Sequence, residues 1–493
     1  MSAGQHLDSS ISTIPYPVPH IPLPPQPLRT VLSYHLVCIG SGPAGQRAAV
    51  QAAKLGKRVA VVERRGALGG VCVATGTIPS KTFREAIART MNREGVADAW
   101  TAGVMSQRPT AQQLLARVDQ VMCREADIIA KQLQRNGVDV VRGEASFIDP
   151  HRIRVHAGED STELEADSVL IAVGTTAAPP PCATADGDVI ITSDDICGLR
   201  ALPRSLAVVG AGVIGIEYAS MFAALGVEVT LVDKRTRPLE FLDAEIVDEL
   251  LHQLRDRSVA FRGGEAVSRL EIREGPPRRA VLELESGKRI VSDMVLFSVG
   301  RTGATSGLAL ERAGLAADDR GRITVDATFR TSVPHIYAAG DVIGYPSLAA
   351  TSSEQGRLAA CYALGAPAHP MTSHFPIGIY AIPEVSMVGA PEHELTAARV
   401  PYEVGVARYR EIARGQILGD DSGFFKMLFH RETRCLLGVH IIGSGATELL
   451  HIGQAVLGLG GGLDYFLDTV FNYPTLAECY KVAALNAANK LSS

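Results

Sequence analysis

The chain of 493 residues lacks long apolar runs, a strong excess of one charge and paired cysteines. Its apolar runs, such as residues 169–173 and 295–299, are far shorter than the roughly 20 residues that cross a bilayer, so no membrane span is expected. The formal net charge is −5 and there is no long basic run, which argues against a nucleic-acid partner. The eight cysteines form no CxxC pair and no cluster with metal-ligand spacing. We therefore expect no metal site and a reducing, cytoplasmic location.

Residues 1–33 differ in composition from the rest of the chain. Seven prolines lie between Pro15 and Pro27, and no periodic apolar pattern accompanies them, which is typical of an extended, poorly ordered arm. A targeting peptide is the alternative. The arm has Asp8, Arg29 as its one arginine and no apolar core, so it matches neither a transit peptide nor a secretory signal well.

The stretch from Tyr34 to Glu63 reads as strand, glycine-rich turn, small-residue helix and second strand. We call this strand–turn–helix–strand motif a dinucleotide-binding device. In it Gly40 allows the tight turn, Gly42 lets the backbone approach a pyrophosphate, and Gly45 lets the helix pack closely on the strand. Glu63 can accept hydrogen bonds from an adenosine ribose, and the helix N-terminus favours phosphate. A single motif of this kind could also be no more than a glycine-rich turn.

The same device returns at residues 205–233. In both copies the acid at the end of the second strand lies 23 positions after the first glycine, from Gly40 to Glu63 and from Gly210 to Asp233. An apolar strand that ends in glycine follows each copy, so the sequence predicts two dinucleotide-binding domains. The further glycines concerned are Gly212 and Gly215 in the second copy, Gly174 after the first copy and Gly300 after the second.

Three stretches carry a family resemblance: GGVCVATGTIPSK at 69–81, TSVPHIYAAGD at 331–341 and FNYPTLAE at 471–478. In this order they resemble the two-dinucleotide-binding flavoprotein disulfide reductases, and the resemblance runs from about residue 34 to the C-terminus. It implies an α/β fold with two Rossmann-like domains and a C-terminal α+β dimerisation domain. It also implies one non-covalent FAD per subunit at the first device and NAD(P) at the second. Gly174 and Asp341 would contact FAD, Asp341 at its ribityl chain, and the chain would form a homodimer or larger homo-oligomer.

The resemblance also implies a division of the chain. The expected parts are the arm at 1–33, an FAD-binding domain at 34–176 and 304–351, an NAD(P)-binding domain at 177–303 and a dimerisation domain at 352–493.

Both parts of the family's thiol relay are changed. Family members have a second cysteine five positions after the first, and a histidine in an HPTxxE motif; here Cys72 is followed by Thr77, and Tyr473 precedes Pro474. A threonine cannot form a disulfide, and a tyrosine with an ordinary pKa near 10 is a poor proton relay. Electrons are therefore not expected to leave through sulfur. We interpret Cys72 as a small buried side chain, and Tyr473 and Glu478 as interface or pocket residues.

The GTIPSK and NYPTxxE stretches are similar to the family's Si-specific transhydrogenase branch. This implies an enzyme that moves hydride reversibly between NADPH/NADP+ and NAD+/NADH through FAD by a ping-pong mechanism, with no redox disulfide. An NAD(P)H oxidase or a quinone or dye reductase of the same fold is an alternative. A non-catalytic, FAD-bound redox sensor is another.

Two groups of charged residues bear on this chemistry. The family pattern implies that Lys81 lies near the flavin and pairs with Glu217, where an ammonium stabilises developing negative charge; a solvated lysine and a structural carboxylate are the alternative. A helix after Leu348 would direct its positive end at the flavin. At the second device Asp233 favours NAD, whereas a nearby cation accommodates the 2′-phosphate of NADP. The sequence does not select among Lys234, Arg235 and Arg237, and a solvated loop is the alternative.

Overall fold

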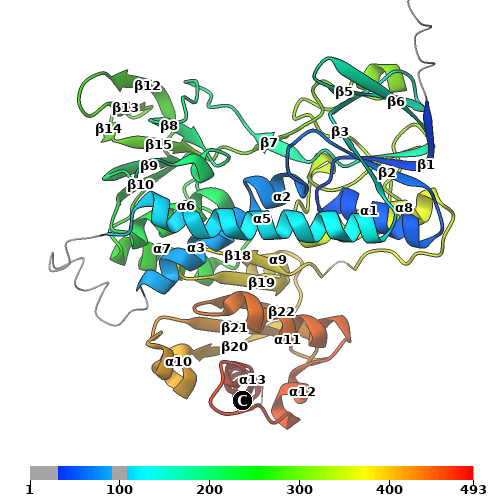
Figure 1. Ribbon diagram of the computed structural model, residues 1–493. Helices are drawn as coiled ribbons and strands as arrows, with labels where there is room; N and C mark the ends of the chain where they lie inside the picture. The colour runs from blue at the N-terminus through cyan, green and yellow to red at the C-terminus, as the bar shows by residue number, and fades with distance from the viewer. Residues whose placement is uncertain (1–30, 92–107, 373, 492–493) are drawn as a thin grey trace, which may run out of the picture.

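The computed structural model describes residues 31–91, 108–372 and 374–491 (Figure 1). Most of the predicted arm lies outside these residues. Leu32 and Ser33, which the composition assigns to the arm, pair with Leu164 and Glu165 of the neighbouring strand. The sheet therefore begins two residues before position 34, because the long neighbouring strand offers partners beyond the recognisable motif.

The first lobe is built on a mixed sheet in the order β3-β2-β1-β6-β5-β4, with β17 beside β6. Its centre is parallel, and β4, β5 and β6 form an antiparallel edge. Two helices, α1 (Pro43–Lys54) and α8 (Ala349–Ala363), pack together on this lobe, and α5 (Ala111–Arg135) runs across it (Figure 1). The strands are β1 (Leu32–Ile39), β2 (Val59–Glu63), β3 (Asp139–Arg142), β4 (Glu144–Phe147), β5 (Arg152–Ala157), β6 (Asp160–Ile171) and β17 (Ile336–Ala338).

The second lobe repeats the parallel arrangement in the order β11-β10-β9-β15-β8. A three-stranded antiparallel sheet, β12-β13-β14, lies at its outer end (Figure 1). The chain crosses between the lobes twice, at β7 (Thr175–Ala177) and β16 (Arg301–Gly303), and these two strands pair with each other. The other elements are β8 (Ile190–Thr192), β9 (Ser205–Val209), α6 (Val213–Ala224), β10 (Glu228–Asp233), α7 (Ala244–Asp256), β11 (Ala260–Gly263), β12 (Val267–Arg273), β13 (Arg279–Leu284), β14 (Arg289–Ser292) and β15 (Met294–Phe297).

The third lobe is an antiparallel sheet, β18-β19-β22-β21-β20, with helices beside it. The predicted fold class, two Rossmann-like domains with a C-terminal α+β domain, is confirmed. In the described parts of the chain, no helix combines the length and the apolar character needed to cross a membrane. The elements are β18 (Ile377–Ile379), β19 (Val385–Gly389), α9 (Glu392–Ala397), β20 (Tyr402–Arg408), α10 (Ala413–Leu418), β21 (Phe424–His430), β22 (Leu436–Ile442), α11 (Ala446–Gly458), α12 (Leu463–Asp468) and α13 (Glu478–Leu491).

The expected start of the C-terminal domain at residue 352 falls inside α8. This helix packs against α1 so closely that a Cβ on Gly356 would lie 2.0 Å from the carbonyl oxygen of Ala44. Helix α8 is therefore part of the first lobe, and the C-terminal lobe follows its end. The sequence predicts a helix after Leu348, where α8 begins, but no residue pattern indicates how far this helix extends.

Candidate functional site

A cavity of about 550 Å³ lies where the three lobes meet. This volume is in the range of small-molecule sites in proteins. The segments around it are the first glycine turn, the helices α2 (Gly70–Ala74) and α3 (Thr77–Met91), and the first turns of α6 and α8. The sequence-predicted residues that line the cavity are Gly40, Gly42, Glu63, Lys81, Gly174, Glu217 and Asp341.

The first glycine turn presents backbone to this cavity. Gly40 has a φ of +108°, and a Cβ on Gly42 would meet no atom within 4 Å, so the turn is open on the cavity side. Gly45 does not line the cavity; a Cβ there would lie 1.9 Å from the carbonyl oxygen of Gly40. Helix α1 begins directly after Gly42, so its N-terminal N–H groups and partial positive charge are at the turn. Such a cradle is suited to phosphate.

The acid of the first device is held by the turn itself. Glu63 is buried and accepts hydrogen bonds from the backbone N–H and hydroxyl of Ser41 and, at 2.8 Å, from the backbone N–H of Arg65. The carboxylate still lines the cavity. It is therefore positioned to accept further hydrogen bonds from hydroxyl groups of a ligand.

Lys81 and Glu217 form an ion pair between α3 and α6. The ammonium lies 2.9 Å from both carboxylate oxygens of Glu217, and the backbone N–H of Tyr380 donates to the same carboxylate at 2.8 Å. Glu217 is 3% exposed and Lys81 is 26% exposed, so the ammonium faces the cavity and the carboxylate anchors it from behind. The Lys81 ammonium also lies 5.0 Å from the centroid of the Tyr380 ring.

Cys72 and Thr77 both line the cavity, from α2 and from the first turn of α3. Burial raises the pKa of the Cys72 thiol, and a hydrogen bond with Thr77 opposes this rise only in part. The thiol is therefore mostly protonated near neutral pH, which disfavours thiolate chemistry.

Asp341 lies in a short 3-10 turn beside the start of α8. The Ser352 hydroxyl donates to its carboxylate at 3.3 Å. The pKa of Asp341 is raised above its usual value by burial, and this hydrogen bond and the positive charge of Arg301 offset the rise only in part. Helix α8 begins at Ala349, and its first residues line the cavity, so the positive end of its dipole is directed there.

The second glycine turn lies outside the cavity, although residues of α6, the helix that follows this turn, line the cavity. Gly210 has a φ of +103°, and a Cβ on Gly212 would meet no atom within 4 Å. Gly215 is a packing position, because a Cβ there would lie 1.9 Å from the carbonyl oxygen of Gly210. The predicted NAD(P)-binding residues that do not line the cavity are Gly210, Gly212, Gly215, Asp233, Lys234, Arg235 and Gly300.

Sequence reasoning missed the part of the cavity that the C-terminal lobe supplies. Tyr380, Thr447 and His451 line it, about 170 to 240 residues after Gly210 of the second glycine turn. No motif or spacing in the sequence assigns Tyr380 to this site. Tyr473 and Glu478 do not line the cavity, and the Tyr473 side chain is 68% exposed.

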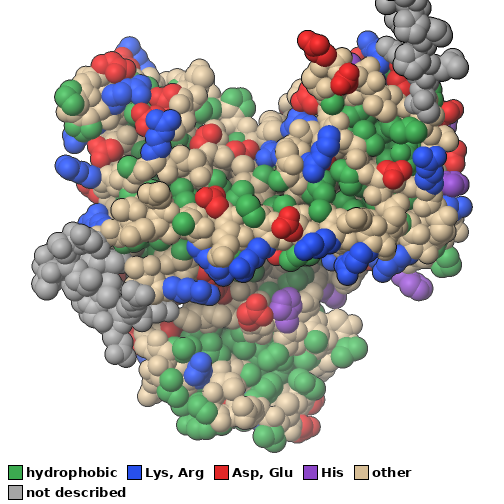
Figure 2. Space-filling view, in the orientation of Figure 1, with side chains coloured by type: hydrophobic (Ala, Val, Ile, Leu, Met, Phe, Trp, Pro, Cys, Tyr) green, Lys and Arg blue, Asp and Glu red, His purple; other side chains and the backbone are tan. Residues whose placement is uncertain are grey.

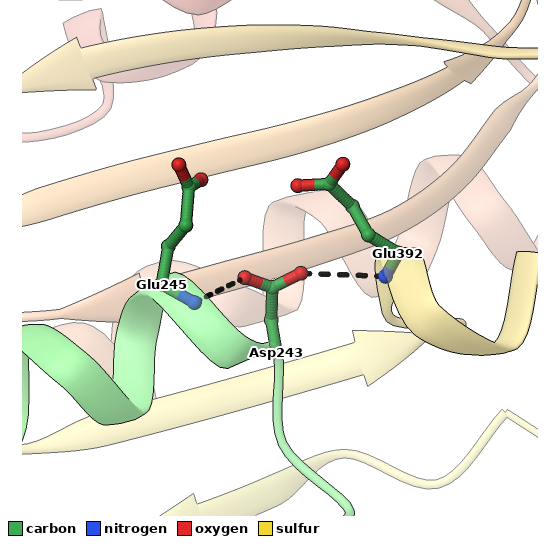
Figure 3. Close-up of side chains that lie close together, drawn as sticks. All are labelled: Asp243, Glu245 and Glu392. Carbon is green, nitrogen blue, oxygen red and sulfur yellow. Dashed lines mark hydrogen bonds between the residues drawn. The ribbon is translucent and has the colours of Figure 1, made fainter. Parts of the chain in front are cut away.

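A second cluster of charges joins the C-terminal lobe to the second lobe. Asp243, Glu245 and Glu392 lie together, and the backbone N–H groups of the last two donate to Asp243 at 3.1 and 3.3 Å (Figure 3). The fully buried Lys426 places its ammonium between them, 3.0 Å from Asp243 and 2.6 Å from Glu245 and also in contact with Glu392. Because the ammonium already supplies the positive charge, we assign this cluster as an ion-pair network between the lobes.

Comparison with known proteins gives the family. Residues 34–356 match the pyridine nucleotide-disulphide oxidoreductase family and residues 375–484 match its dimerisation domain, and the chain belongs to this family. A protein of Mycobacterium tuberculosis named soluble pyridine nucleotide transhydrogenase is 53% identical over 462 residues, which cover 93% of this chain and 98% of the relative. The protein of the same name from Photobacterium profundum is 43% identical over 463 residues, with 93% and 98% covered. The resemblance predicted from the motifs is confirmed.

The chain is also similar to solved structures over nearly its full length. The crystal structure of LpdA from Mycobacterium tuberculosis is 30% identical with a TM-score of 0.83, and the alignment covers 92% of this chain and 99% of LpdA. The HOCl-induced flavoprotein disulfide reductase RclA of Escherichia coli is 27% identical with the same TM-score and the same coverage of both chains.

Proposed function

We propose that this protein is a transhydrogenase that moves hydride reversibly between NADPH/NADP+ and NAD+/NADH by a ping-pong mechanism, with bound FAD as the carrier and no redox disulfide. The two nucleotides use one pocket in turn, and the nucleotide pools set the direction. The names of the relatives at 43% and 53% identity support this activity.

The residues around the cavity fit FAD. The open backbone at Gly42 and the N-terminus of α1 suit its pyrophosphate, Glu63 its adenosine ribose and Asp341 its ribityl chain. FAD supplies reversible hydride-accepting chemistry, which no amino-acid side chain provides. Gly174 and Lys81 line the same cavity.

Lys81 and Glu217 are the residues to which we assign an electrostatic role. Glu217 holds the ammonium at the cavity wall, where it stabilises negative charge that develops during hydride transfer. The preformed pair means that little reorganisation is needed at the moment of reaction. The N-terminus of α8 adds positive potential from another side of the cavity.

The observation that carries the proposal is the pair Cys72 and Thr77. A hydroxyl occupies the place where a resolving thiol would stand, and burial raises the pKa of the remaining thiol. With no sulfur partner for Cys72 and no histidine at position 473, the family's thiol route is closed, and we assign a second nucleotide as the acceptor of the hydride.

The same proposal extends to the whole protein. We assign the first lobe to FAD and the third to a homodimer interface. We assign the second lobe to NAD(P), at Gly210, Gly212, Gly215, Glu217, Asp233, Lys234, Arg235 and Gly300. The family's dimerisation domain at residues 375–484 supports the homodimer interface. All eight cysteines are free, which supports a cytoplasmic location.

The test is turnover between two nucleotides. The purified FAD-loaded protein is mixed without oxygen with NADPH and thio-NAD+, and formation of reduced thio-NAD is followed, with lipoamide in a parallel assay. Transfer to thio-NAD+ and none to lipoamide is expected. Reduction of the bound flavin by NADPH without transfer to thio-NAD+ would instead indicate an oxidase, a quinone reductase or a sensor.

A further inference from the structure

The acids of the two glycine turns have different partners. Glu63 is held by Ser41 and by the backbone N–H of Arg65. Asp233 accepts backbone hydrogen bonds of the same kind, but it is also bound by the guanidinium of Arg235, with Nε at 2.9 Å and Nη2 at 2.8 Å. Each acid is followed two positions later by an arginine, Arg65 after Glu63 and Arg235 after Asp233. Of these two described pairs, only Arg235 binds its acid through the guanidinium.

This difference matches a difference in ligand chemistry. The adenosine ribose of FAD carries hydroxyl groups, which a bare carboxylate can bind. At an NAD(P) site the same carboxylate accepts from the 2′-hydroxyl of NAD but repels the 2′-phosphate of NADP. Burial raises the pKa of Asp233, yet the hydrogen bonds from Arg235 and from the backbone outweigh this and lower it. Asp233 is therefore ionised at neutral pH, and an NADP site needs a cation to offset it.

Arg235 is the cation that the structure places at this acid. Its side chain is 40% exposed, whereas Asp233 is 5% exposed, so the guanidinium has room to turn away. Arg237 is bound instead to Asp248 and to the carbonyl oxygen of Ala244 on α7. The loop therefore offers one guanidinium next to the ribose-binding acid and one that is held elsewhere.

Asp233 also tolerates the departure of Arg235. Its carboxylate keeps the backbone N–H of Ala211 at 2.6 Å and the backbone N–H of Arg235 at 2.8 Å when the guanidinium leaves. After an exchange of partner the carboxylate still has these two hydrogen bonds, which lowers the cost of separating the ion pair.

We propose that Arg235 changes partner with the nucleotide. It stays on Asp233 when a 2′-hydroxyl binds the acid, and it turns to the 2′-phosphate when NADP(H) enters. This inference rests on the proposed function, in which one pocket takes both nucleotides. It makes Arg235 a specificity-determining residue that admits NADP(H) without excluding NAD(H).

Two probes separate the two states. ADP-ribose and 2′-phospho-ADP-ribose differ by the 2′-phosphate alone and carry no nicotinamide, and their binding to the FAD-loaded protein is measured by calorimetry. Arg235→Gln is expected to weaken the binding of 2′-phospho-ADP-ribose by roughly 10- to 100-fold, which is the effect of losing one charged hydrogen-bonded contact. The same substitution is expected to change the affinity for ADP-ribose by less than about threefold. Asp233→Asn is expected to weaken the binding of ADP-ribose. It is expected to strengthen the binding of 2′-phospho-ADP-ribose, because the acid no longer competes for the guanidinium.

Arg237→Gln is the matched control and is expected to leave both affinities unchanged within about twofold, since its guanidinium is bound to α7. Arg235→Lys, which keeps the charge, is expected to recover part of the lost affinity and to show that the loop is intact. Three results would overturn the exchange. In the first, Arg235→Gln weakens the binding of both probes equally. In the others, Asp233→Asn weakens the binding of 2′-phospho-ADP-ribose, or only Arg237→Gln changes an affinity. Because the probes cannot be reduced or oxidised at a nicotinamide, their binding does not depend on the outcome of the hydride-transfer test.

Discussion

At position 77 a hydroxyl replaces the thiol that the family resemblance implies, and this single change decides which acceptors remain. Cys72 and Thr77 line the same cavity, and Thr77 is close enough to lower the pKa of the Cys72 thiol in part, so a thiol at position 77 would stand next to Cys72. The sequence predicted the missing sulfur directly, because the two positions belong to one short motif. It could not predict the burial that raises the pKa of the Cys72 thiol, since that depends on how α2 and α3 pack with α5 and α6, which come later in the chain.

Restoring the second thiol tests this point. Thr77→Cys is expected to raise the reductant needed in an anaerobic dithionite titration from about one two-electron equivalent per FAD to about two, because a disulfide between Cys72 and the introduced thiol then accepts a second pair. Thr77→Ser keeps the hydroxyl and is expected to titrate like the unaltered protein. An unaltered protein that already consumes two equivalents would contradict the absence of a redox disulfide.

Lys81 provides the second prediction at the residue scale. Lys81→Met removes the ammonium from the cavity and is expected to slow flavin reduction by NADPH by about 100-fold, the size typical of a lost preorganised electrostatic contact. Anaerobic stopped-flow absorbance measures the rate, and FAD content is measured in parallel. Lys131→Met, on an exposed position of α5, is the control and should keep the original rate. A normal rate in Lys81→Met with full FAD content would remove Lys81 from the mechanism.

Among the elements, the two glycine turns were the most predictable, because turn, helix and acid follow from a local spacing. The partners of Arg235 and Arg237 were not predictable, since the same loop sequence allows either arginine to face Asp233. The extent of α8 was also missed. Its length depends on the close contact of Gly356 with Ala44 in α1, which joins residues far apart in the chain.

The contact between α1 and α8 gives a prediction about stability. Gly356→Ala puts a Cβ about 2.0 Å from the carbonyl oxygen of Ala44, so the helices must separate, and we expect a loss of roughly 1–3 kcal/mol in the free energy of unfolding together with weaker FAD binding. Urea unfolding and FAD titration measure the two effects. Gly458→Ala, at the end of α11 with no atom within 4 Å of the new Cβ, is the control and should be neutral or slightly stabilising. Equal effects of the two substitutions would show that the contact is not tight in solution.

At the scale of the whole molecule, the cavity depends on all three lobes. The sequence predicted the first two from repeated motifs and the third from resemblance. It did not predict that Tyr380, through its backbone N–H, helps to hold Glu217, because that contact forms only when the C-terminal lobe packs on α6. The buried Lys426 and its three carboxylates join the same two lobes, and they too are far apart in the sequence.

The C-terminal lobe carries apolar side chains that no described residue covers. Figure 2 shows apolar side chains gathered on the lower lobe, and Leu459 is 88% and Val470 92% exposed. We expect light scattering coupled to gel filtration to give a dimer, and Val470→Asp to shift it toward the monomer, because a charge is costly in an apolar interface. Val291→Asp, on β14 of the second lobe, is the control and should stay dimeric. A monomeric unaltered protein, or a dimer that Val470→Asp leaves intact, would contradict this interface.

The central claim is that hydride entering from one nucleotide leaves to another without sulfur. Double-mixing stopped-flow tests it most directly: the protein is reduced without oxygen by one equivalent of NADPH and then mixed with NAD+. We predict reoxidation at least as fast as steady-state turnover, with one NADH formed per FAD, and reoxidation by lipoamide at least about 100-fold slower. Reoxidation by NAD+ that is slower than turnover, or no faster than with lipoamide, would contradict the account.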